Sequence, residues 1–311
     1  MAVGGHPQRV LCKPLGQTGV ALPEVGLGAH LYRAGPEPLR RGLEAGALFI
    51  DTAESYGTEE VVGQALRGMR ERVFIATKVS PEHFRRADVV KAADGSLQRL
   101  RIDCIDLYQL HEPSHTVPIE ETMEAMEQLV EAGKVRFIGV SNFSVAEQQR
   151  AQRALRKHRI AANQVRYNLV DRTIEEGLLA YCQAHQVSVI AYSPLARGLP
   201  QILDGDPKGV LAEVARMTGK TVAQVAINWC LCKDGVFAIP RSSSAERIVE
   251  NCGASDWRLT SDQIRLLDEN IVFRRRSRME VLLRRFAPRG LKKGAQRLVQ
   301  LLPAGVRRRF N

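Results

Sequence analysis

Short apolar runs alternate along the chain with longer segments in which apolar residues recur every three to four positions. Eight of the runs predict strands, because nearly continuous apolar sequence is typical of parallel strands covered on both faces. Their ranges are 25–29, 48–52, 73–79, 104–110, 135–141, 162–167, 188–193 and 236–240. Residues 11–23, with Gly16-Gln17-Thr18-Gly19 at their centre, predict a hairpin in front of the first strand.

Segments with helical periodicity follow the strands one by one. We expect helices over 37–45, 60–67, 87–101, 119–132, 145–157 and 174–185, two consecutive helical stretches over 210–232, and a last pair of helices over 245–252 and 261–272. Ser144, with Glu147 three residues later, forms a capping-box pattern at the start of the fifth segment, and Gly133 ends the fourth. Strand and helix therefore alternate strictly.

Eight strand–helix units in this order predict an α/β fold, a closed parallel (β/α)8 TIM barrel preceded by a hairpin. Such a barrel takes about 250 residues, which accounts for most of the 311 residues in this chain. An open, doubly wound sheet is the alternative. It is disfavoured because no G-x-G-x-x-G follows the first strand, where Gly26-Leu27-Gly28 supplies only a G-x-G.

The net charge of +11 is concentrated at one end of the chain. From residue 274 onward there are 13 Lys and Arg against one acidic residue, which leaves 32 basic and 33 acidic residues in 1–273. We therefore expect two parts, a barrel over 1–273 and a basic tail over 274–311. The tail has amphipathic helical spacing in two places, from Met279 to Phe286 and from Leu291 to Leu302.

A basic amphipathic tail is typical of segments that bind an anionic membrane surface or an acidic partner. The alternative is that its apolar faces pack on the barrel and its arginines are solvated. Nucleic acid is not expected as a partner, because aromatic residues do not interleave with the basic ones and residues 1–273 are close to neutral. The N-terminus lacks the apolar region of a secretory signal, and no run reaches the roughly 18 apolar residues of a membrane span. These features predict a cytoplasmic protein.

The cysteines are scattered through the chain, unlike the dense frameworks of disulfide-rich domains. They are Cys12, Cys104, Cys182, Cys230, Cys232 and Cys252. Cys230 and Cys232 form a C-x-C within a predicted helix, with no second pair or nearby histidine to complete a zinc site. We expect apolar, buried cysteines and no bound metal.

Polar residues suited to catalysis follow three successive predicted strands. Asp51 lies at the end of the second strand and Tyr56 follows it, Lys78 lies at the end of the third, and His111 follows the fourth. The C-terminal ends of barrel strands meet at one rim, so these side chains are expected to converge. A neighbouring ammonium lowers the pKa of a tyrosine toward the range in which it works as a general acid, and Asp51 can balance that ammonium. A histidine there can donate to a carbonyl oxygen that gains negative charge, so the set suits protonation of a carbonyl by an enzyme with an outside hydride donor.

Taken singly, each of the four residues also has a structural interpretation. Asp51 suits a helix cap, Tyr56 a surface or core position, Lys78 a structural ion pair with Asp51, and His111 a hydrogen-bonded core position. Their convergence on successive strand ends favours the catalytic interpretation.

Residues 51–60, Asp-Thr-Ala-Glu-Ser-Tyr-Gly-Thr-Glu-Glu, resemble the D-T-A-x-x-Y-G-x-x-E signature of the aldo-keto reductase family. Further blocks of that family are matched in order at 76–79, 106–111, 138–143, 191–195 and 239–244, followed by Arg247 and Glu250-Asn251. The resemblance covers roughly residues 11–272. It implies a TIM barrel that reduces an aldehyde or ketone to an alcohol with NADPH.

The resemblance also assigns roles to residues. It implies that Tyr56 donates the proton, that Lys78 and Asp51 tune it, and that His111 orients the carbonyl. For the NADPH/NADP+ cofactor it implies Ser141, Asn142 and Gln164 at the carboxamide, Tyr192 on the nicotinamide ring, Ser193, Leu195 and Arg197 at the pyrophosphate, Arg241, Ser242 and Arg247 at the 2′-phosphate, and Glu250 and Asn251 at the adenine. Two guanidinium groups and a hydroxyl suit a dianionic phosphate, so we expect NADPH to be preferred over NADH.

Two positions depart from the family pattern. Many relatives have Lys where this chain has Arg241, which keeps the charge, and Trp where this chain has Glu112. Glu112 removes an aromatic wall from the substrate pocket, so we expect an open pocket and the substrate is not identified. The alternative function is a non-catalytic NADP-binding regulatory subunit that its basic tail recruits to a partner or a membrane.

Overall fold

The computed structural model describes residues 10–114 and 116–274, and every structural statement below concerns those residues. The two amphipathic segments of the predicted tail lie outside them. The helical tail and its boundary with the barrel therefore stay predictions.

The described strands form an antiparallel hairpin and an eight-stranded parallel sheet whose strands follow one another in sequence order. The hairpin pairs β1 (Cys12–Pro14) with β2 (Ala21–Pro23), as predicted. The parallel strands are β3 (Leu27–Gly28), β4 (Phe49–Asp51), β5 (Phe74–Val79), β6 (Ile105–Leu110), β7 (Val135–Ser141), β8 (Ile160–Arg166), β9 (Ser188–Tyr192) and β10 (Val236–Ile239). Every predicted strand is thus present, within two residues at each boundary.

The first and last strands meet and close the sheet into a barrel. Val25 forms a parallel bridge with Ala238, and the amides of Gly26 and Gly28 donate to the carbonyl oxygens of Ala238 (2.9 Å) and Pro240 (3.1 Å). A Cβ at Gly28 would lie 2.8 Å from the carbonyl oxygen of Ile239, so this G-x-G serves a close backbone approach. The TIM barrel is confirmed, and the open-sheet alternative is wrong.

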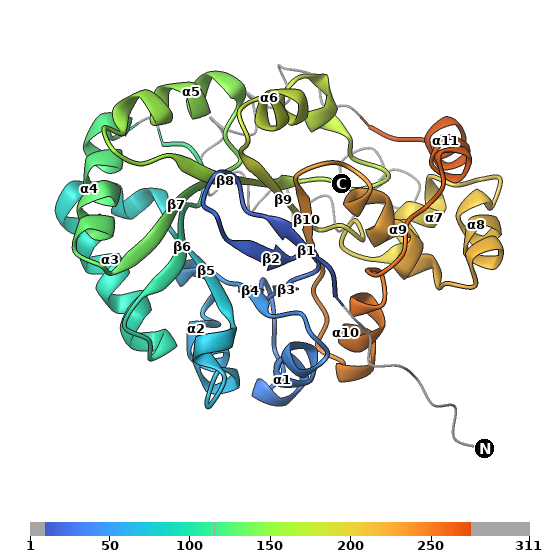
Figure 1. Cartoon of the computed structure of the whole chain (residues 1–311), viewed down its shortest axis with the longest axis horizontal. Helices are drawn as coiled ribbons and strands as arrows, with labels where there is room; N and C mark the ends of the chain where they lie inside the picture. Colours follow the sequence, from blue (N-terminus) through green and yellow to red (C-terminus); the bar gives the residue numbers. More distant parts are fainter. Residues whose placement is uncertain (1–9, 115, 275–311) are drawn as a thin grey trace, which may run out of the picture. The chain divides into compact units, whose positions relative to one another are not determined.

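Helices follow the strands and surround the barrel (Figure 1). They are α1 (Pro36–Glu44), α2 (Glu59–Ala65), α3 (Arg86–Leu100), α4 (Ile119–Glu131), α5 (Val145–Ala154), α6 (Leu178–Ala184), α7 (Leu199–Asp204), α8 (Val210–Thr218), α9 (Val222–Leu231), α10 (Ala245–Cys252) and α11 (Ser261–Asn270). The capping box of Ser144 and Glu147 begins α5 as predicted. None of the helices within the described residues is long and apolar enough to cross a membrane.

Glycines explain two differences between the expected helices and those observed. The predicted helix over 174–185 is split into a 3-10 turn (Thr173–Glu176) and α6 by Gly177, whose φ is 137°. The helical stretch predicted over 210–232 is divided into α8 and α9 at Gly219, whose φ is 64°. Helix α7, in the loop after β9, was not predicted because its six residues are too few to display a helical period.

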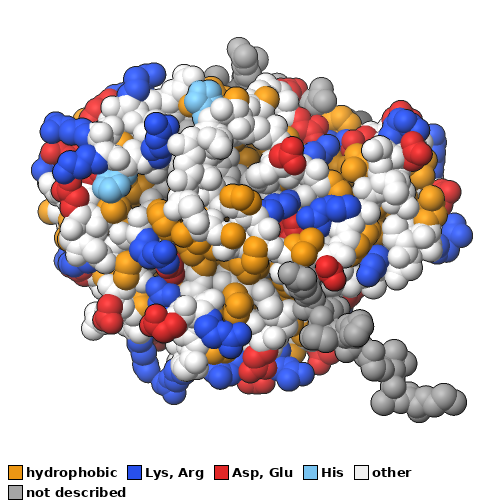
Figure 2. Space-filling view, in the orientation of Figure 1, with side chains coloured by type: hydrophobic (Ala, Val, Ile, Leu, Met, Phe, Trp, Pro, Cys, Tyr) orange, Lys and Arg blue, Asp and Glu red, His pale blue; other side chains and the backbone are white. Residues whose placement is uncertain are grey.

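The interior of the barrel is apolar at its N-terminal end. Phe49, Phe74 and Phe237 pack there with Leu15 and Leu22 of the hairpin segment. The hairpin lies across this mouth of the barrel in Figure 1, and Figure 2 shows apolar side chains at the centre of the same face with both charge signs around them. A second, larger core fills the space between the strands and the helices. The polar part of the barrel is therefore left to the opposite, C-terminal rim.

Three of the six cysteines, Cys182, Cys230 and Cys252, are buried as expected, whereas Cys104 and Cys232 are partly exposed and Cys12 is exposed. Burial raises the pKa of Cys182, Cys230 and Cys252 to about 12 each. These thiols are protonated at neutral pH and behave as apolar core groups.

Candidate active site

Strand register places the predicted catalytic residues at the C-terminal rim. Side chains two residues apart on a strand point to the same face. Phe49 lies inside the barrel, so Asp51 also points inward, and the pairing of Lys78 with Gln109 across β5 and β6 puts both in the next layer. A 3-10 turn after β4 (Glu54–Tyr56) brings Tyr56 over this layer.

Lys78 and Asp51 form an ion pair inside the rim. The Lys78 Nζ donates to Asp51 Oδ1 at 2.6 Å and to the carbonyl oxygen of Thr52 at 2.7 Å. Lys78 is fully buried and Asp51 is almost so. Burial has the largest single effect and lowers the pKa of Lys78, but Asp51 and Tyr56 together outweigh it, and the pKa is raised. The ammonium is therefore charged at every pH at which the protein is expected to work.

Two amide side chains hold the other oxygen of Asp51. Gln164 Nε2 donates to Asp51 Oδ2 at 2.7 Å, and Gln109 Nε2 donates to the same atom at 3.2 Å. Gln109 was not among the predicted site residues, although its position two residues before His111 places it on the same strand face. Gly139 leaves room for it, since a Cβ there would lie 2.8 Å from Gln109 Cγ. Asp51 is thus held by three donors.

Tyr56 lies between the ammonium of Lys78 and the imidazole of His111. Its hydroxyl is 3.4 Å from His111 Nε2, and Lys78 Nζ is 4.9 Å from the centre of its ring. Burial raises the pKa of Tyr56, while the Lys78 charge acts in the opposite direction. The expectation that the ammonium lowers the pKa of Tyr56 is right for that single interaction but wrong for the sum, because burial has the larger effect.

His111 is neutral at this site. Burial lowers the pKa of His111 to about 3, and the positive charge of Lys78 and the neighbouring His30 add to the effect. The Ser55 hydroxyl is 3.3 Å from Nδ1, and the Asn142 amide donates to the backbone oxygen of His111 at 3.1 Å. A neutral imidazole has one N–H to donate, so His111 can act as a hydrogen-bond donor without carrying charge.

The residues predicted at the nicotinamide form one hydrogen-bonded group on the ends of β7, β8 and β9. Tyr192 donates to Asn142 Oδ1 (3.1 Å), Asn142 Nδ2 donates to Ser141 Oγ (3.0 Å), and Ser141 donates to the backbone oxygen of Gln164 (2.9 Å). The structure therefore brings these four side chains together beside Asp51.

Strained backbone marks the loops beside that group. Asn142, Ser193, Ala196 and Arg197 all have φ between 51° and 67°, which residues other than glycine seldom adopt. Such strain is concentrated at functional sites, where the surrounding structure holds it in place. Ser193 and Arg197 were predicted at the pyrophosphate, and Leu195 between them packs against the core.

The residues predicted at the 2′-phosphate surround the start of α10. Arg241 and Arg247 are exposed. Ser242 Oγ accepts a hydrogen bond from the amide of Ser244, and Ser244 is the N-cap of the helix. Helix N-termini attract anions, and two guanidinium groups add to that attraction. Of the two residues predicted at the adenine, Asn251 is buried and Glu250 partly exposed on the same helix.

Glu112, the departure from the family pattern, is partly buried beside His111. Within the described residues it makes no ion pair or side-chain hydrogen bond. The same part of the chain contains no group of three or more His, Cys, Asp or Glu side chains that is placed to hold a metal ion.

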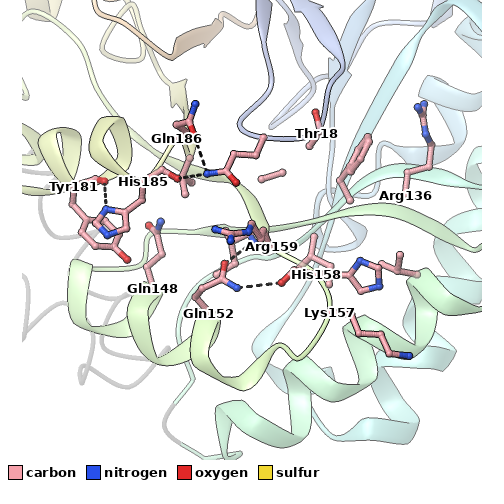
Figure 3. A pocket seen from close by; sticks show the side chains of 17 residues that line it. Thr18, Arg136, Gln148, Gln152, Lys157, His158, Arg159, Tyr181, His185 and Gln186 are labelled. Atoms are coloured by element: carbon pink, nitrogen blue, oxygen red, sulfur yellow. Dashed lines mark hydrogen bonds between the residues drawn. The ribbon is translucent and has the colours of Figure 1, made fainter.

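Two cavities, of about 450 and 560 Å³, lie at the N-terminal end of the barrel, away from these residues. Figure 3 shows the first, which contains Arg136, Lys157 and Arg159 but no carboxylate. Arg136 pairs with Asp106 (2.7 Å) and Lys157 with Glu131 (2.5 Å), so neighbouring residues neutralise much of its positive charge. We assign no ligand to it, and the C-terminal rim remains the candidate site.

Tyr, His, Lys and Asp side chains thus meet at the C-terminal rim of a TIM barrel, the end at which barrel enzymes have their active sites. The chain belongs to the aldo/keto reductase family, whose model matches residues 34–271.

Similar proteins support this assignment. The chain is 39% identical over 261 residues to methylglyoxal reductase YeaE of Escherichia coli, covering 80% of this chain and 91% of the relative. It is 34% identical over 258 residues to glyoxal reductase of Bacillus subtilis, covering 80% and 89%. Its fold matches the crystal structure of an aldo-keto reductase from Klebsiella pneumoniae in complex with NADPH, with a TM-score of 0.75, 39% identity, and coverage of 83% of this chain and 94% of that one.

Proposed function

We propose that this protein reduces an aldehyde or a ketone to the alcohol, with NADPH as the hydride donor. As a member of its family it is an NADP-dependent oxidoreductase. The observation that supports the proposal most is the position of Tyr56, whose hydroxyl is 3.4 Å from His111 Nε2 while its ring faces the buried Lys78 ammonium. A carbonyl oxygen bound beside the phenol and the imidazole has two hydrogen-bond donors within reach.

In this proposal Tyr56 is the general acid. It gives its proton to the carbonyl oxygen while the carbonyl carbon accepts a hydride, and the resulting phenolate is stabilised by the Lys78 ammonium 4.9 Å from its ring centre. Asp51 keeps Lys78 charged and in place, and Gln109 and Gln164 hold Asp51. His111 orients the carbonyl by donating from Nε2, with Nδ1 toward the Ser55 hydroxyl.

The residues of the rim fit the cofactor. When bound, NADPH supplies the hydride from its nicotinamide ring. We propose that Ser141, Asn142 and Gln164 bind its carboxamide and that Tyr192 stacks on the ring. Arg241 and Arg247 at the start of α10, with Ser242, suit the 2′-phosphate, since two guanidinium groups and a helix N-terminus favour a dianion.

Small carbonyl compounds are the first substrates to test. Two relatives are named as reductases of methylglyoxal and of glyoxal, both of which are vicinal dicarbonyl compounds. The polar, partly buried Glu112 beside His111 also favours a hydrophilic substrate over a large apolar one.

The test is NADPH oxidation, followed by the loss of reduced-cofactor absorbance, with methylglyoxal and with an activated aromatic aldehyde. Tyr56→Phe is expected to lower kcat at least about 100-fold, the usual contribution of a general acid, while NADPH still binds in a fluorescence titration. Tyr181→Phe is the matched control, because Tyr181 lines the cavity at the other end of the barrel. Tight NADPH binding without turnover in the parent protein would favour the regulatory alternative.

We further propose that the basic tail, residues 274–311, contacts an anionic membrane surface. Its 13 Lys and Arg against a single acidic residue are the support for this. Co-sedimentation with phosphatidylserine vesicles is expected for the full chain and not for a chain that ends at Val272. Equal pelleting of the two would contradict the proposal.

A further inference from the structure

The turn after β3 places a second histidine at the catalytic rim. The amide of Ala29 donates to the backbone oxygen of Asp51 (2.9 Å), and the amide of Tyr32 donates back to Ala29 (3.2 Å). Between them Leu31 adopts a φ of 55°, which is unfavourable for a leucine. This tight turn presents His30, whose ring centre lies 4.7 Å from that of Tyr56 in an edge-to-face arrangement. The backbone of Asp51 thus ties His30 to the catalytic group.

Tyr56 therefore has an imidazole contact in addition to that of His111. The ring centres of Tyr56 and His111 are 5.3 Å apart, and their planes are inclined at 78°. Both histidines are close enough to the proposed general acid to touch a substrate whose carbonyl oxygen lies beside the Tyr56 hydroxyl. His111 is engaged through Ser55 and through the Tyr56 hydroxyl. His30 differs from His111 in its hydrogen bonding.

The ring nitrogens of His30 make no hydrogen bond within the described residues, and the side chain is exposed at the rim. Burial of part of the ring lowers the pKa of His30, and the nearby positive charges of Arg197, Lys78 and Arg241 lower it further. The imidazole is consequently neutral at pH 7, with one N–H to donate and one nitrogen to accept. The N–H of His30 is therefore available to donate a hydrogen bond to a substrate that is bound beside Tyr56.

We propose that His30 determines specificity by hydrogen bonding an oxygen on the carbon next to the reacting carbonyl. The preferred substrates are then 2-oxoaldehydes and 2-hydroxycarbonyl compounds. The inference rests on the proposed carbonyl reduction: with the reacting oxygen beside Tyr56 and His111, an oxygen one carbon away is the group that reaches His30. A carbonyl compound without that second oxygen leaves the His30 donor unused. His30 is a specificity residue in this proposal, and the general acid remains Tyr56.

The competing role for His30 is packing alone. An edge-to-face contact that merely positions the Tyr56 ring would affect every substrate equally, because each depends on the same proton donor. The distinction is therefore measurable as a ratio of two substrates in the same protein. Methylglyoxal and propanal suit the comparison, since each has three carbons and an aldehyde, and only methylglyoxal has the second oxygen.

The experiment measures kcat/KM for methylglyoxal and propanal in the parent protein, His30→Phe, His30→Asn and His185→Phe. Phe keeps an aromatic ring and removes the donor, whereas Asn keeps a donor. The ratio of kcat/KM for methylglyoxal to that for propanal is expected to fall about 3- to 10-fold in His30→Phe, which corresponds to the loss of one neutral hydrogen bond. The change is expected mainly as a higher KM for methylglyoxal. It is expected to stay within about 2-fold of the parent ratio in His30→Asn, by the same scale. His185, in the cavity at the opposite end, serves as the matched control, and its variant is expected to keep the parent ratio.

If kcat/KM falls by the same factor for both substrates in His30→Phe, the inference is overturned and His30 is a packing residue. An unchanged ratio would overturn it as well. Failure of the parent protein to reduce either substrate is a different result: it would count against the proposed function itself. A titration of each variant with NADPH establishes that the cofactor site is intact before the ratios are compared.

Discussion

The buried pair of Lys78 and Asp51 leads to a prediction about stability as well as catalysis. In Asp51→Asn the Lys78 ammonium, which has no exposed surface, keeps the carbonyl oxygen of Thr52, the ring of Tyr56 and a neutral amide as partners but loses its counter-charge. Removing one partner of a buried ion pair costs about 3–5 kcal/mol of unfolding free energy. We expect a loss of that size at pH 7, together with a loss of turnover.

The pH dependence of this loss follows from the pKa of Lys78. In the parent protein that pKa is raised, so the stability it contributes is present below the unfolded value of about 10.4 and is lost only as the pH rises through the higher folded value. In Asp51→Asn burial has no carboxylate to oppose it, so the folded pKa falls below the unfolded one. The variant then gains stability as the pH rises from that depressed pKa toward 10.4, by up to about 1.4 kcal/mol per pH unit.

Urea unfolding of both proteins at several values between pH 7 and 9.5 measures the effect. The difference in unfolding free energy between the two is the relevant quantity, because contributions from groups common to both, such as the buried cysteines, cancel. The difference is expected to shrink as the pH rises. The double variant Asp51→Asn/Lys78→Met, which removes the buried charge, is expected to be more stable than Asp51→Asn at pH 7. A pH-independent loss below about 1 kcal/mol would refute this account of the pair, since breaking a buried pair normally costs more.

Three further predictions concern the same rim. Gly139→Ala is expected to lose about 1–3 kcal/mol of stability to overpacking and to have a lower kcat, because the added Cβ would lie 2.8 Å from Gln109 Cγ. Urea unfolding and turnover measure the two effects, and parent-like values for both would contradict the prediction. The pH profile of kcat/KM is expected to show no inflection near 6.5 from His111, whose pKa is about 3, so the imidazole stays neutral from pH 8 to 5; an inflection there that disappears in His111→Gln would show the opposite. Arg247→Ala is expected to weaken NADPH binding about 10-fold or more and NADH binding much less, as measured by fluorescence titration. Equal weakening of the binding of both cofactors would show that Arg247 does not bind the 2′-phosphate.

Much of the fold could be predicted from the sequence, because parallel barrel strands have a distinctive pattern. Nearly continuous apolar runs such as 135–141 are covered on both faces, and their boundaries agree with β7 at both ends. The convergence of Asp51, Lys78 and His111 also followed from position alone, since each comes at the C-terminal end of a strand. Helix α7 is different: a single short helix has no period to read.

The finer organisation of the site depended on contacts between distant residues. Gln109 is one example, because its role requires Gly139 on the neighbouring strand to leave it room. The sign of the Tyr56 pKa shift is another, since the sequence indicates a charge partner but not the extent of burial that outweighs it. His30 was missed because the turn that directs it toward Tyr56 depends on a left-handed leucine, which no residue preference predicts.

The short contact between the first and last strands has a consequence for how the barrel opens. β3 has two residues, and the backbone amides of Gly26, Gly28 and Ala238 supply the hydrogen bonds that join the first strand segment to β10. Few hydrogen bonds hold this edge, so we expect local separation of the strands to cost less free energy here than among β5, β6 and β7. His30 is the second residue after β3, and the amide of Ala29 donates a hydrogen bond to the backbone oxygen of Asp51. We therefore expect fluctuations at this edge to reach the proposed substrate side of the site, and we expect smaller movements where β5, β6 and β7 pair over more residues.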